Sequence, residues 1–293
     1  MREAVIVSTA RTPLTKSHRG EFNATPGPQL AAYSVKAAVE RSGIEPELIE
    51  DLVMGCGYPE GITGKNIGRQ TALRAGLPLS VAGMVASRFC ASGLQSVAIA
   101  AGRIVAEGVP AMVAGGVESI SAIRAGNPAD IDPWLQEHKP DLYMAMIDTA
   151  DIVAHRYGIS REDQDAFSLQ SQQRTAAAQQ AGVFADEIVP CTTRMMEKNK
   201  ETSEVTYREV TATHDNCNRA STTLEGLAKL EPVKGPGQFI TAGNASQLSD
   251  GSSACVLMEA KEAERRGLQP LGAFRGFAVA GCEPDEMGIG PVF

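Results

Sequence analysis

This 293-residue chain is poor in the residues that build metal sites and nucleic-acid interfaces. Its six cysteines form no Cys-x-x-Cys pair, and its four histidines stand at no spacing typical of a zinc site. Lysine and arginine number 27 against 35 aspartate and glutamate, which gives a formal net charge of −8. A general nucleic-acid binder needs a basic face. We therefore expect no metal and no nucleic-acid partner, although a local basic patch can still hold an acidic ligand.

Signals for export and membrane insertion are also scarce. The N-terminus passes at once into a strand-like run, Ala4 to Ser8, without the layout of a signal peptide, and we find no uninterrupted apolar run of transmembrane length. We predict a cytoplasmic protein with reduced cysteines and no membrane partner. Hydrophobic residues make up 43% and charged residues 21%, as in soluble globular proteins. The length allows one large domain or two of roughly 100–200 residues.

Short apolar runs alternate with helix-like segments in the first part of the chain. We expect strands at 4–8, 52–56, 81–85 and 111–116, and helices at 29–42, 66–75 and 92–107. This alternation predicts an α/β fold with a largely parallel sheet and helices on both faces. Ligands gather at the carboxyl ends of the strands in such sheets. Cys90, Glu118 and Ser119 all fall at such ends.

The pattern changes between about residues 120 and 240, where the chain is irregular and polar. We interpret this block as an excursion inserted into the α/β domain. Within it we expect a long helix at 162–180, opened by the capping box Ser160–Asp163, and a charged, β-like segment at 187–218. After it we expect a strand at 254–258, a helix at 261–266 and another strand from 271 to 281. A strand that has just begun when the sequence stops indicates an incomplete domain.

Cys90 is the candidate around which the other residues are arranged. It follows an expected strand and precedes an expected helix, where backbone N–H groups and the helix dipole favour negative charge. Such a setting lowers a thiol pKa and favours a nucleophilic thiolate. The alternative is a small buried core cysteine, the commonest fate of a free cysteine. The remaining cysteines are interpreted as structural: Cys56 and Cys255 in strand runs, and Cys191, Cys217 and Cys282 in loops.

Five stretches together resemble the thiolase family, close to the acetyl-CoA acyltransferases. They are Ser8–Pro13, Arg88–Gln95, Ala114–Ser119, Asp163–Phe167, and Thr241–Ser246 followed by Asp250-Gly251. Their order and spacing agree with the family over the whole chain. The resemblance implies a thiolase-like αβαβα layered fold made of two similar halves. Residues 1–119 and 241–270 would form the N-terminal half, 120–240 an inserted loop domain that binds CoA, and 271–293 the start of a C-terminal half that is largely missing.

The resemblance also implies a reaction. Cys90 matches the family nucleophile, which takes the acyl group of a 3-oxoacyl-CoA in a reversible Claisen reaction and passes it to a second CoA. Coenzyme A is then a substrate, and no bound cofactor is expected. The family's Asn-Glu-Ala-Phe, Gly-His-Pro and Cys-x-Gly segments, which supply an oxyanion-site asparagine, an activating histidine and a second cysteine, do not occur in these 293 residues. The resemblance further suggests a homodimer or homotetramer.

Four residues match family positions that contact CoA or border the thioester pocket: Arg219, Ala242, Ser246 and Met146. Arg219 would lie near the adenine nucleotide, where a guanidinium can stack on a ring or contact phosphate. Each has a plainer interpretation as a solvated loop arginine, a Gly/Asn/Ser turn or a core methionine. Glu118 is a tempting general base, but a carboxylate after a Gly-Gly turn more often binds backbone.

Three other functions stay open. The same enzyme could run in the biosynthetic direction and condense two acetyl-CoA molecules. A β-ketoacyl synthase acting on carrier-bound chains is disfavoured by the 120–240 block and by the Thr241–Ser246 stretch. A non-catalytic acyl-CoA-binding or scaffold protein is favoured by the absent histidine and second cysteine, and for this reason we expect the 293-residue chain alone to turn over slowly or not at all.

Overall fold

The computed structural model describes residues 2–123 and 131–293, and it divides into two compact units. The first unit consists of Met1–Arg124, Phe184–Cys217 and Leu248–Gly276. The second consists of Ala125–Val183, Asn218–Gln247 and Phe277–Phe293. The α/β fold class is confirmed. The expected 120–240 block is not compact as a whole, because residues 184–217 pack with the first unit, and the proposed domain boundaries stay a prediction.

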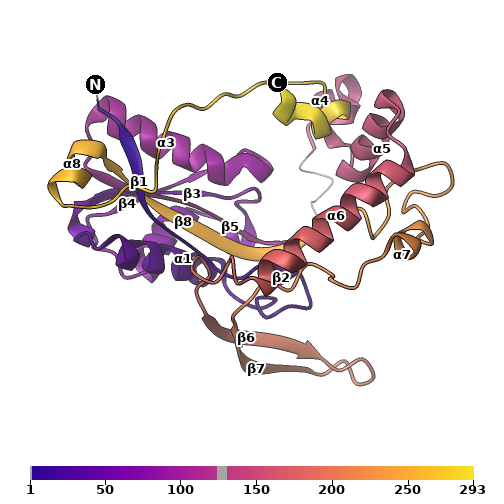
Figure 1. Ribbon diagram of the computed structural model, residues 1–293, viewed down its shortest axis with the longest axis horizontal. Coiled ribbons are helices and arrows are strands. Elements are labelled where there is room, and N and C mark those ends of the chain that lie inside the picture. The colour runs from indigo at the N-terminus through magenta and orange to yellow at the C-terminus, as the bar shows by residue number, and fades with distance from the viewer. Residues whose placement is uncertain (1, 124–130) are drawn as a thin grey trace. The chain divides into compact units, whose positions relative to one another are not determined.

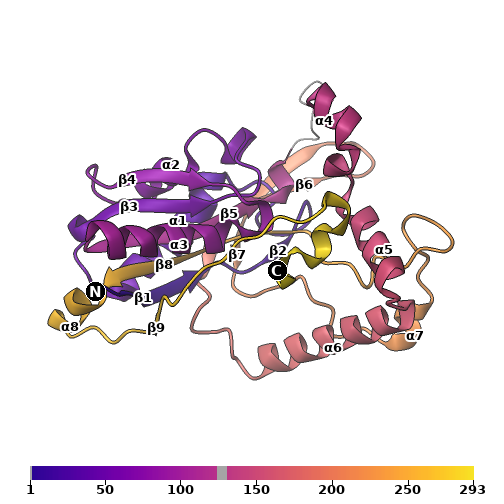
Figure 2. The ribbon, with the colours of Figure 1, turned by 90° about the horizontal axis from the view of Figure 1, so that it is seen from above.

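The first unit is built on a mixed seven-stranded sheet with the order β4-β3-β5-β8-β1-β9, in which β2 also pairs with β8 (Figure 2). The strands are β1 (Ala4–Arg11), β2 (Thr15–Lys16), β3 (Ile49–Gly55), β4 (Ala82–Ala86), β5 (Ala111–Ser119), β8 (Ser249–Glu259) and β9 (Gly272–Ala273). Strand β3 runs parallel to β4 and β5, as the alternation of strands and helices predicts. Strand β8 runs antiparallel to all three strands with which it pairs, β1, β2 and β5. The prediction of a largely parallel sheet is therefore wrong for β8, because no crossover helix precedes it.

Strands β5 and β8 meet at the point where the chain leaves the sheet and returns to it. Ser119 at the end of β5 faces Asp250 near the start of β8. The Asp250 carboxylate is fully buried and accepts hydrogen bonds from the Ser121 N–H, at 2.9 Å, and from the Ser121 hydroxyl. The two ends of the 130-residue stretch between these strands are thereby held together.

Helices cover both faces of this sheet, and Figure 1 shows α3 and α1 on opposite sides of the strands. The helices of this unit are α1 (Gly27–Ser42), α2 (Ile67–Arg74), α3 (Ser92–Glu107) and α8 (Ala260–Arg265). Successive strand side chains point to opposite faces, so Leu52 and Met54 pack with α1 and α2 while Val53 packs with α3. Two apolar cores result, one on each side of the sheet.

The α3 helix combines a buried face with an exposed one. Together with the 3₁₀ turn before it, the segment Phe89–Glu107 is long and apolar enough to cross a membrane by length and composition alone. Ala100, Ala101 and Ile104 are nevertheless completely buried against the sheet, whereas Leu94 is 60% exposed. Packing on a sheet is typical of a core helix of a soluble domain, and small residues on the buried face let α3 lie close to the strands.

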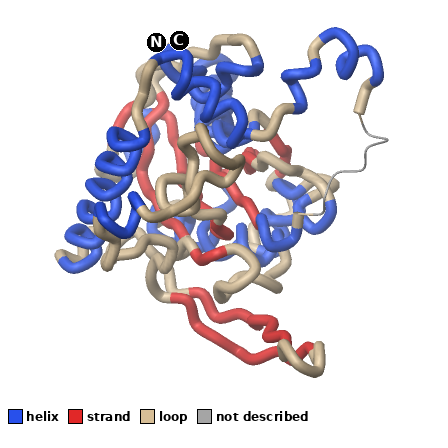
Figure 3. The backbone as a smooth tube through the Cα atoms, turned by 90° about the vertical axis from the view of Figure 1, so that its right-hand side faces the viewer, coloured by secondary structure: helices blue, strands red, loops and turns tan. Residues whose placement is uncertain are grey.

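The β-like 187–218 segment forms a two-stranded antiparallel hairpin of β6 (Cys191–Lys198) and β7 (Val205–Ala212), drawn in red at the bottom of Figure 3. Its base is bonded to the loop before α1 and to α1 itself. The Thr25 and Thr193 hydroxyls lie 2.8 Å apart, and the Tyr33 hydroxyl donates to the Thr192 carbonyl. Most of β7 is exposed.

The second unit is helical and has few buried residues. It contains α4 (Pro133–His138), α5 (Met146–Tyr157), α6 (Arg161–Gln180), α7 (Leu224–Ala228) and the 3₁₀ segments Pro140–Tyr143 and Pro284–Val292. The capping box at the start of α6 is present, with the Asp163 N–H donating to the Ser160 hydroxyl at 3.1 Å. Arg156 on α5 forms ion pairs with Asp285 and Glu286, both at 2.6 Å, which attach the last residues of the chain to this helix.

The strand expected at 271–281 is mostly wrong. Only Gly272–Ala273 pairs, antiparallel to Val5 and Ile6 of β1. Leu271 and Val279 are 65% and 56% exposed. An extended apolar run is stable as a strand when another element packs against its side chains. Among the described residues, the side chains of Leu271 and Val279 stay mostly exposed.

Candidate active site

Cys90 lies in a single 3₁₀ turn, Phe89–Ala91, between the end of β4 and the first residue of α3. Its side chain is exposed. The bend is closed by Ser92, whose hydroxyl accepts from the Arg88 N–H at 2.8 Å and donates to the Phe89 carbonyl at 2.5 Å. Phe89 has a φ of +44°, which is uncommon for a residue with a side chain. The thiol is thus presented where a strand gives way to a helix N-terminus, as the sequence predicts.

Close backbone contact sets the start of α3 against the sheet. A Cβ atom on Gly55, the last residue of β3, would lie 2.3 Å from the Ser92 carbonyl oxygen, and one on Gly116 would lie 3.3 Å from the Cα of Gly93. No side chain longer than hydrogen fits at Gly55 without moving the helix. These two glycines therefore allow the first turn of α3, and the cysteine before it, to rest on the carboxyl edge of β3 and β5.

Glu118 reaches the turn that follows β3. Its Oε2 accepts a hydrogen bond from the Gly57 N–H at 2.8 Å, and its Oε1 lies 3.7 Å from the Cys56 Sγ. Burial raises the pKa of Glu118, although the backbone donors favour its charged form. These contacts support the interpretation of Glu118 as a carboxylate that binds backbone.

Four of the other cysteines, Cys56, Cys191, Cys217 and Cys255, are wholly or partly buried. Burial raises the pKa of the Cys191 and Cys255 thiols to about 12, and burial together with the charge of Glu118 does the same for Cys56. Burial also raises the pKa of Cys217. Cys191 begins β6 and is fully buried, so its expected place in a loop is wrong.

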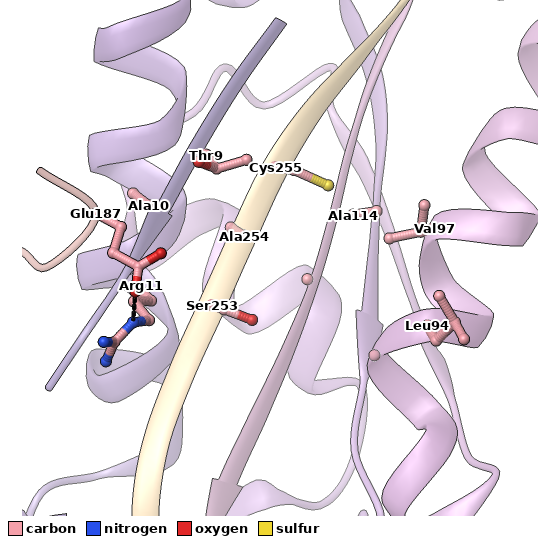
Figure 4. A pocket seen from close by; sticks show the side chains of 12 residues that line it. Thr9, Ala10, Arg11, Leu94, Val97, Ala114, Glu187, Ser253, Ala254 and Cys255 are labelled. Carbon is pink, nitrogen blue, oxygen red and sulfur yellow. Dashed lines mark hydrogen bonds and ion pairs between the residues drawn. The ribbon is translucent and has the colours of Figure 1, made fainter. Parts of the chain in front are cut away.

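A pocket of about 450 Å³ opens on the α3 side of the sheet in the first unit. Figure 4 shows Cys255, Ser253 and Ala114 on the strands, Leu94 and Val97 on α3, and the Arg11–Glu187 pair at the opposite boundary. The residues that line it include Gly93, three residues after Cys90. Among the described residues, Cys90 itself does not line the pocket. The pocket is mainly apolar and neighbours the nucleophile rather than containing it.

Ala242 and Ser246, both exposed, lie on or just after a tight turn of the second unit. The turn is closed by Thr241, whose hydroxyl accepts from the N–H groups of Gly243 and Asn244 at 3.1 and 3.3 Å. The Asn244 side-chain amide then donates to Asp165 on α6 at 3.1 Å. This is more than a generic Gly/Asn/Ser turn, because a buried carboxylate fixes it to a helix.

Two buried carboxylates, which we did not single out from the sequence, organise this region. Asp151 on α5 accepts from the N–H groups of Phe239 and Ile240 at 2.8 and 3.2 Å. Asp165 accepts from Arg161 at 2.8 Å, and Arg161 also donates to the Leu227 carbonyl at 2.6 Å. The Arg161–Asp165 spacing of four residues on a helix was a readable signal. Through these two aspartates the turn with Ala242 and Ser246 is joined to both helices.

Met146 and Arg219 complete the four CoA candidates, and all four lie in the second unit. Met146 is the first residue of α5 and is 60% exposed, so the alternative of a core methionine is wrong within this chain. Arg219 is exposed, and its N–H donates to the Gln172 side chain on α6 at 2.6 Å. Over the described part of the chain, its guanidinium forms no ion pair. The structure therefore joins Ala242 and Ser246 to α5, which begins at Met146, and joins Arg219 to α6.

No group of three or more His, Cys, Asp or Glu side chains in the described residues is arranged to hold a metal ion.

Comparison with known proteins agrees with this arrangement. Residues 4–261 match the family model described as "Thiolase, N-terminal domain". The chain belongs to the thiolase family. Among curated members, the Bacillus subtilis (strain 168) "3-ketoacyl-CoA thiolase" is 41% identical over 293 residues, which are 100% of this chain and 75% of that protein.

Further thiolases show the same extent of similarity. The human "3-ketoacyl-CoA thiolase, peroxisomal" is 39% identical over 99% of this chain and 68% of its own length. The crystal structure of the Bacillus anthracis acetyl-CoA acetyltransferase superposes with a TM-score of 0.85 and 33% identity, covering 99% of this chain and 74% of that one. The thiolase-like fold predicted from the sequence is thereby confirmed.

Proposed function

We propose that this protein transfers acyl groups between CoA thioesters, with Cys90 as the nucleophile. The thiolate attacks the C3 carbonyl of a 3-oxoacyl-CoA, and the C2–C3 bond breaks. Its electron pair stays on C2, which takes up a proton as acetyl-CoA leaves. The thiolate of a second CoA then attacks the acyl-cysteine and releases acyl-CoA. A thiolate suits both steps because it is a good nucleophile and a good leaving group.

The observation that carries this proposal is the exposed Cys90 at a strand-to-helix bend in a thiolase N-terminal domain. The protein incubated with acetyl-CoA should gain one acetyl group, located by intact-mass analysis and peptide mapping on Cys90. Cys90→Ser should gain none, whereas Cys282→Ser, which removes the other exposed thiol, should be acetylated as the wild type is. Acetylation elsewhere, or none at all, would contradict the proposal.

We further propose that the second unit binds CoA through Arg219, Ala242, Ser246 and Met146. Arg219→Ala should weaken CoA binding about fivefold, as expected for loss of a charge-assisted contact, and should leave binding of pantetheine unchanged. Arg174→Ala, an exposed arginine on α6, is the matched control. Calorimetric titration measures both, and equal weakening for CoA and pantetheine would place Arg219 away from the nucleotide.

The alternative function is non-catalytic binding of acyl-CoA. It is favoured by the lack of a match to the family's histidine and second-cysteine segments in these 293 residues. The two functions differ in one measurement, since a binding protein forms the CoA complex without an adduct on Cys90. We propose that the adduct forms and that turnover by this chain alone is slow.

A further inference from the structure

The backbone before Cys90 holds an uncommon conformation that its own side chain does little to stabilise. Phe89 has a φ of +44°, and its ring is 67% exposed. Residues with a side chain adopt such angles only where the surroundings hold them there. The Ser92 hydroxyl supports the bend from one side through Arg88 and Phe89. The direction of the Cys90 side chain depends on this bend. A second support, on the side of the sheet, would therefore fix the position of the thiol.

The turn after β3 lies directly against this bend. A Cβ atom on Gly57 would be 3.4 Å from both the carbonyl carbon and the carbonyl oxygen of Phe89. The Tyr58 ring meets the Phe89 ring edge to face, with the centroids 6.0 Å apart. The Ser87 hydroxyl donates to the Gly57 carbonyl at 3.4 Å. The 56–58 turn is therefore the surface on which the nucleophile bend rests.

Glu118 is bonded to this same turn. Its Oε2 accepts the Gly57 N–H at 2.8 Å, and the same oxygen would lie 2.8 Å from a Cβ on Gly57. A side chain at Gly57 would therefore stand too close to the carboxylate and in ordinary contact with the Phe89 carbonyl, so glycine lets the carboxylate approach the turn. In the described residues Glu118 forms no ion pair, so its backbone and thiol partners account for where it points.

We propose that Glu118 is a positioning residue, whose carboxylate holds Gly57 against the Phe89 carbonyl and so keeps the bend, and Cys90, in one orientation. Its role in acyl transfer rests on the proposed function of Cys90, whereas its hold on the bend does not. It differs from general-base catalysis, because the carboxylate acts through a backbone N–H and takes up no proton from substrate.

Two measurements on four variants test this. The variants are Glu118→Ala, Glu118→Gln, Gly57→Ala and, as a control on the opposite end of β3, the exposed Glu50→Ala. The first measurement is amide hydrogen exchange of the peptide covering residues 86–95. The second is the rate at which acetyl-CoA acetylates Cys90, compared with the rate at which iodoacetamide, a small probe with little orientational demand, alkylates it.

Glu118→Ala should raise exchange in residues 86–95 about tenfold, as expected for loss of a hydrogen bond to a charged group. It should slow acetylation by at least about tenfold, because small misplacements of a reacting atom are costly. Iodoacetamide alkylation should change less than about threefold. Glu118→Gln keeps a carbonyl oxygen for the Gly57 N–H and should restore most of both effects.

Gly57→Ala keeps the carboxylate but separates it from the bend, so it should resemble Glu118→Ala, and the double variant should be less impaired than the sum of the two. Wild-type exchange in Glu118→Ala would overturn the proposal. Equal impairment of Glu118→Gln and Glu118→Ala would also overturn it, because charge rather than bonding to Gly57 would then be responsible. If the wild type forms no acetyl adduct while exchange still responds as expected, the proposed function fails and the hold on the bend stands.

Discussion

The two units of this protein are stabilised in different ways. The first has an apolar core on each face of its sheet, with residues such as Leu52, Ile104 and Leu257 completely buried. In the described part of the second unit, the buried residues are Thr149, Asp151, Ala154, Asp165, Leu227 and Thr241. Four of these six are polar, and two are carboxylates that bind backbone and side-chain donors. Hydrophobic burial stabilises the unit that contains Cys90, and hydrogen bonds stabilise the unit that contains the CoA candidates.

This difference has a consequence for recognition. Apolar burial is non-directional and tolerates small movements, whereas a buried carboxylate with several donors specifies one geometry and is costly to disrupt. In the second unit, such bonds define the position of the turn that carries Ala242 and Ser246 relative to α5 and α6. The predictions below each test this contrast.

The largest expected effect concerns thiol reactivity. A thiol pKa of about 12 leaves roughly a thousandfold less thiolate at pH 8 than an ordinary pKa near 9 does. Cys56, Cys191 and Cys255 should therefore resist iodoacetamide in the native protein while the exposed Cys282 reacts. Peptide mapping after timed alkylation measures this, and unfolding in urea should equalise the rates. Rapid native labelling of Cys255 would show that the core of the first unit opens easily.

Leu52→Ala should destabilise the first unit by about 3 kcal/mol, through lost apolar contact and the cavity left behind. Leu52 is fully buried on the α1 side of the sheet. Amide exchange should rise throughout β3 and β5 and much less in α6. The exposed Leu79→Ala, at a position with 81% exposure, serves as the control and should change stability by less than about 0.5 kcal/mol.

Asp165→Ala should destabilise the second unit by about 2 kcal/mol, because it leaves Arg161 and Asn244 without their shared acceptor. Exchange should rise in residues 239–246 and at the start of α6, and CoA binding should weaken. The rate at which iodoacetamide alkylates Cys90 should not change. Asp165→Asn retains one acceptor oxygen, so its stability should fall between those of the wild type and Asp165→Ala. An apolar replacement such as Asp165→Leu that restored full stability would show that this unit does not depend on polar bonding.

The smallest expected effect is the pH dependence of an ion-pair cluster around Arg11 in the first unit. Arg11 forms two bonds to Asp215, at 2.8 and 2.9 Å, and one to Glu187 at 2.8 Å. Burial by itself would raise the pKa of Asp215, but the bonds from Arg11 and from the Leu14 N–H hold it below its usual range.

Because the folded-state pKa of Asp215 is lowered, its contribution to stability is present above the ordinary aspartate value near 3.8 and is lost as pH falls through the lower folded value. Arg11→Met should cost about 1.5 kcal/mol at pH 7 and less at pH 2, where more of Asp215 is protonated. Urea unfolding at the two pH values measures this. Lys36→Met, which removes an exposed cation paired with Glu40, should show no such dependence.

Much of the first unit could be predicted from its residues. Helix α3 begins at Ser92 and ends at Glu107 as expected, because small and apolar residues recur at helical spacing and Gly108 follows with a φ of +80°. The place of β8 could not be predicted, since periodicity identifies a strand but not its neighbours. The short β9 was over-predicted for the same reason, because an apolar run alone does not say whether anything will cover it.

The site was predictable to a different degree. The position of Cys90 at a strand-to-helix junction followed from local pattern, and its identity as a candidate nucleophile followed from the resemblance to thiolases. The positive φ of Phe89 had no signal in the sequence, because phenylalanine does not favour it and the bonds of Ser92 that close the bend are visible only in the structure. Asp151 and Asp165 were missed because an aspartate on a helix is usually solvated, and only its partners show that it is buried. For Asp151 these partners lie almost 90 residues away along the chain.

The pairing of Ser119 with Asp250 affects which insertions and deletions this fold can accept. Because the sheet fixes both ends of the intervening stretch as cross-strand neighbours, that stretch is a closed loop whose ends do not move when its length does. Lengthening such a loop adds little closure entropy, about 0.6 kcal/mol for a doubling. Segments between these two residues can therefore be lengthened, shortened or exchanged between relatives while the nucleophile bend stays as it is. The length of the intervening stretch and the geometry around Cys90 are in this sense free to vary separately.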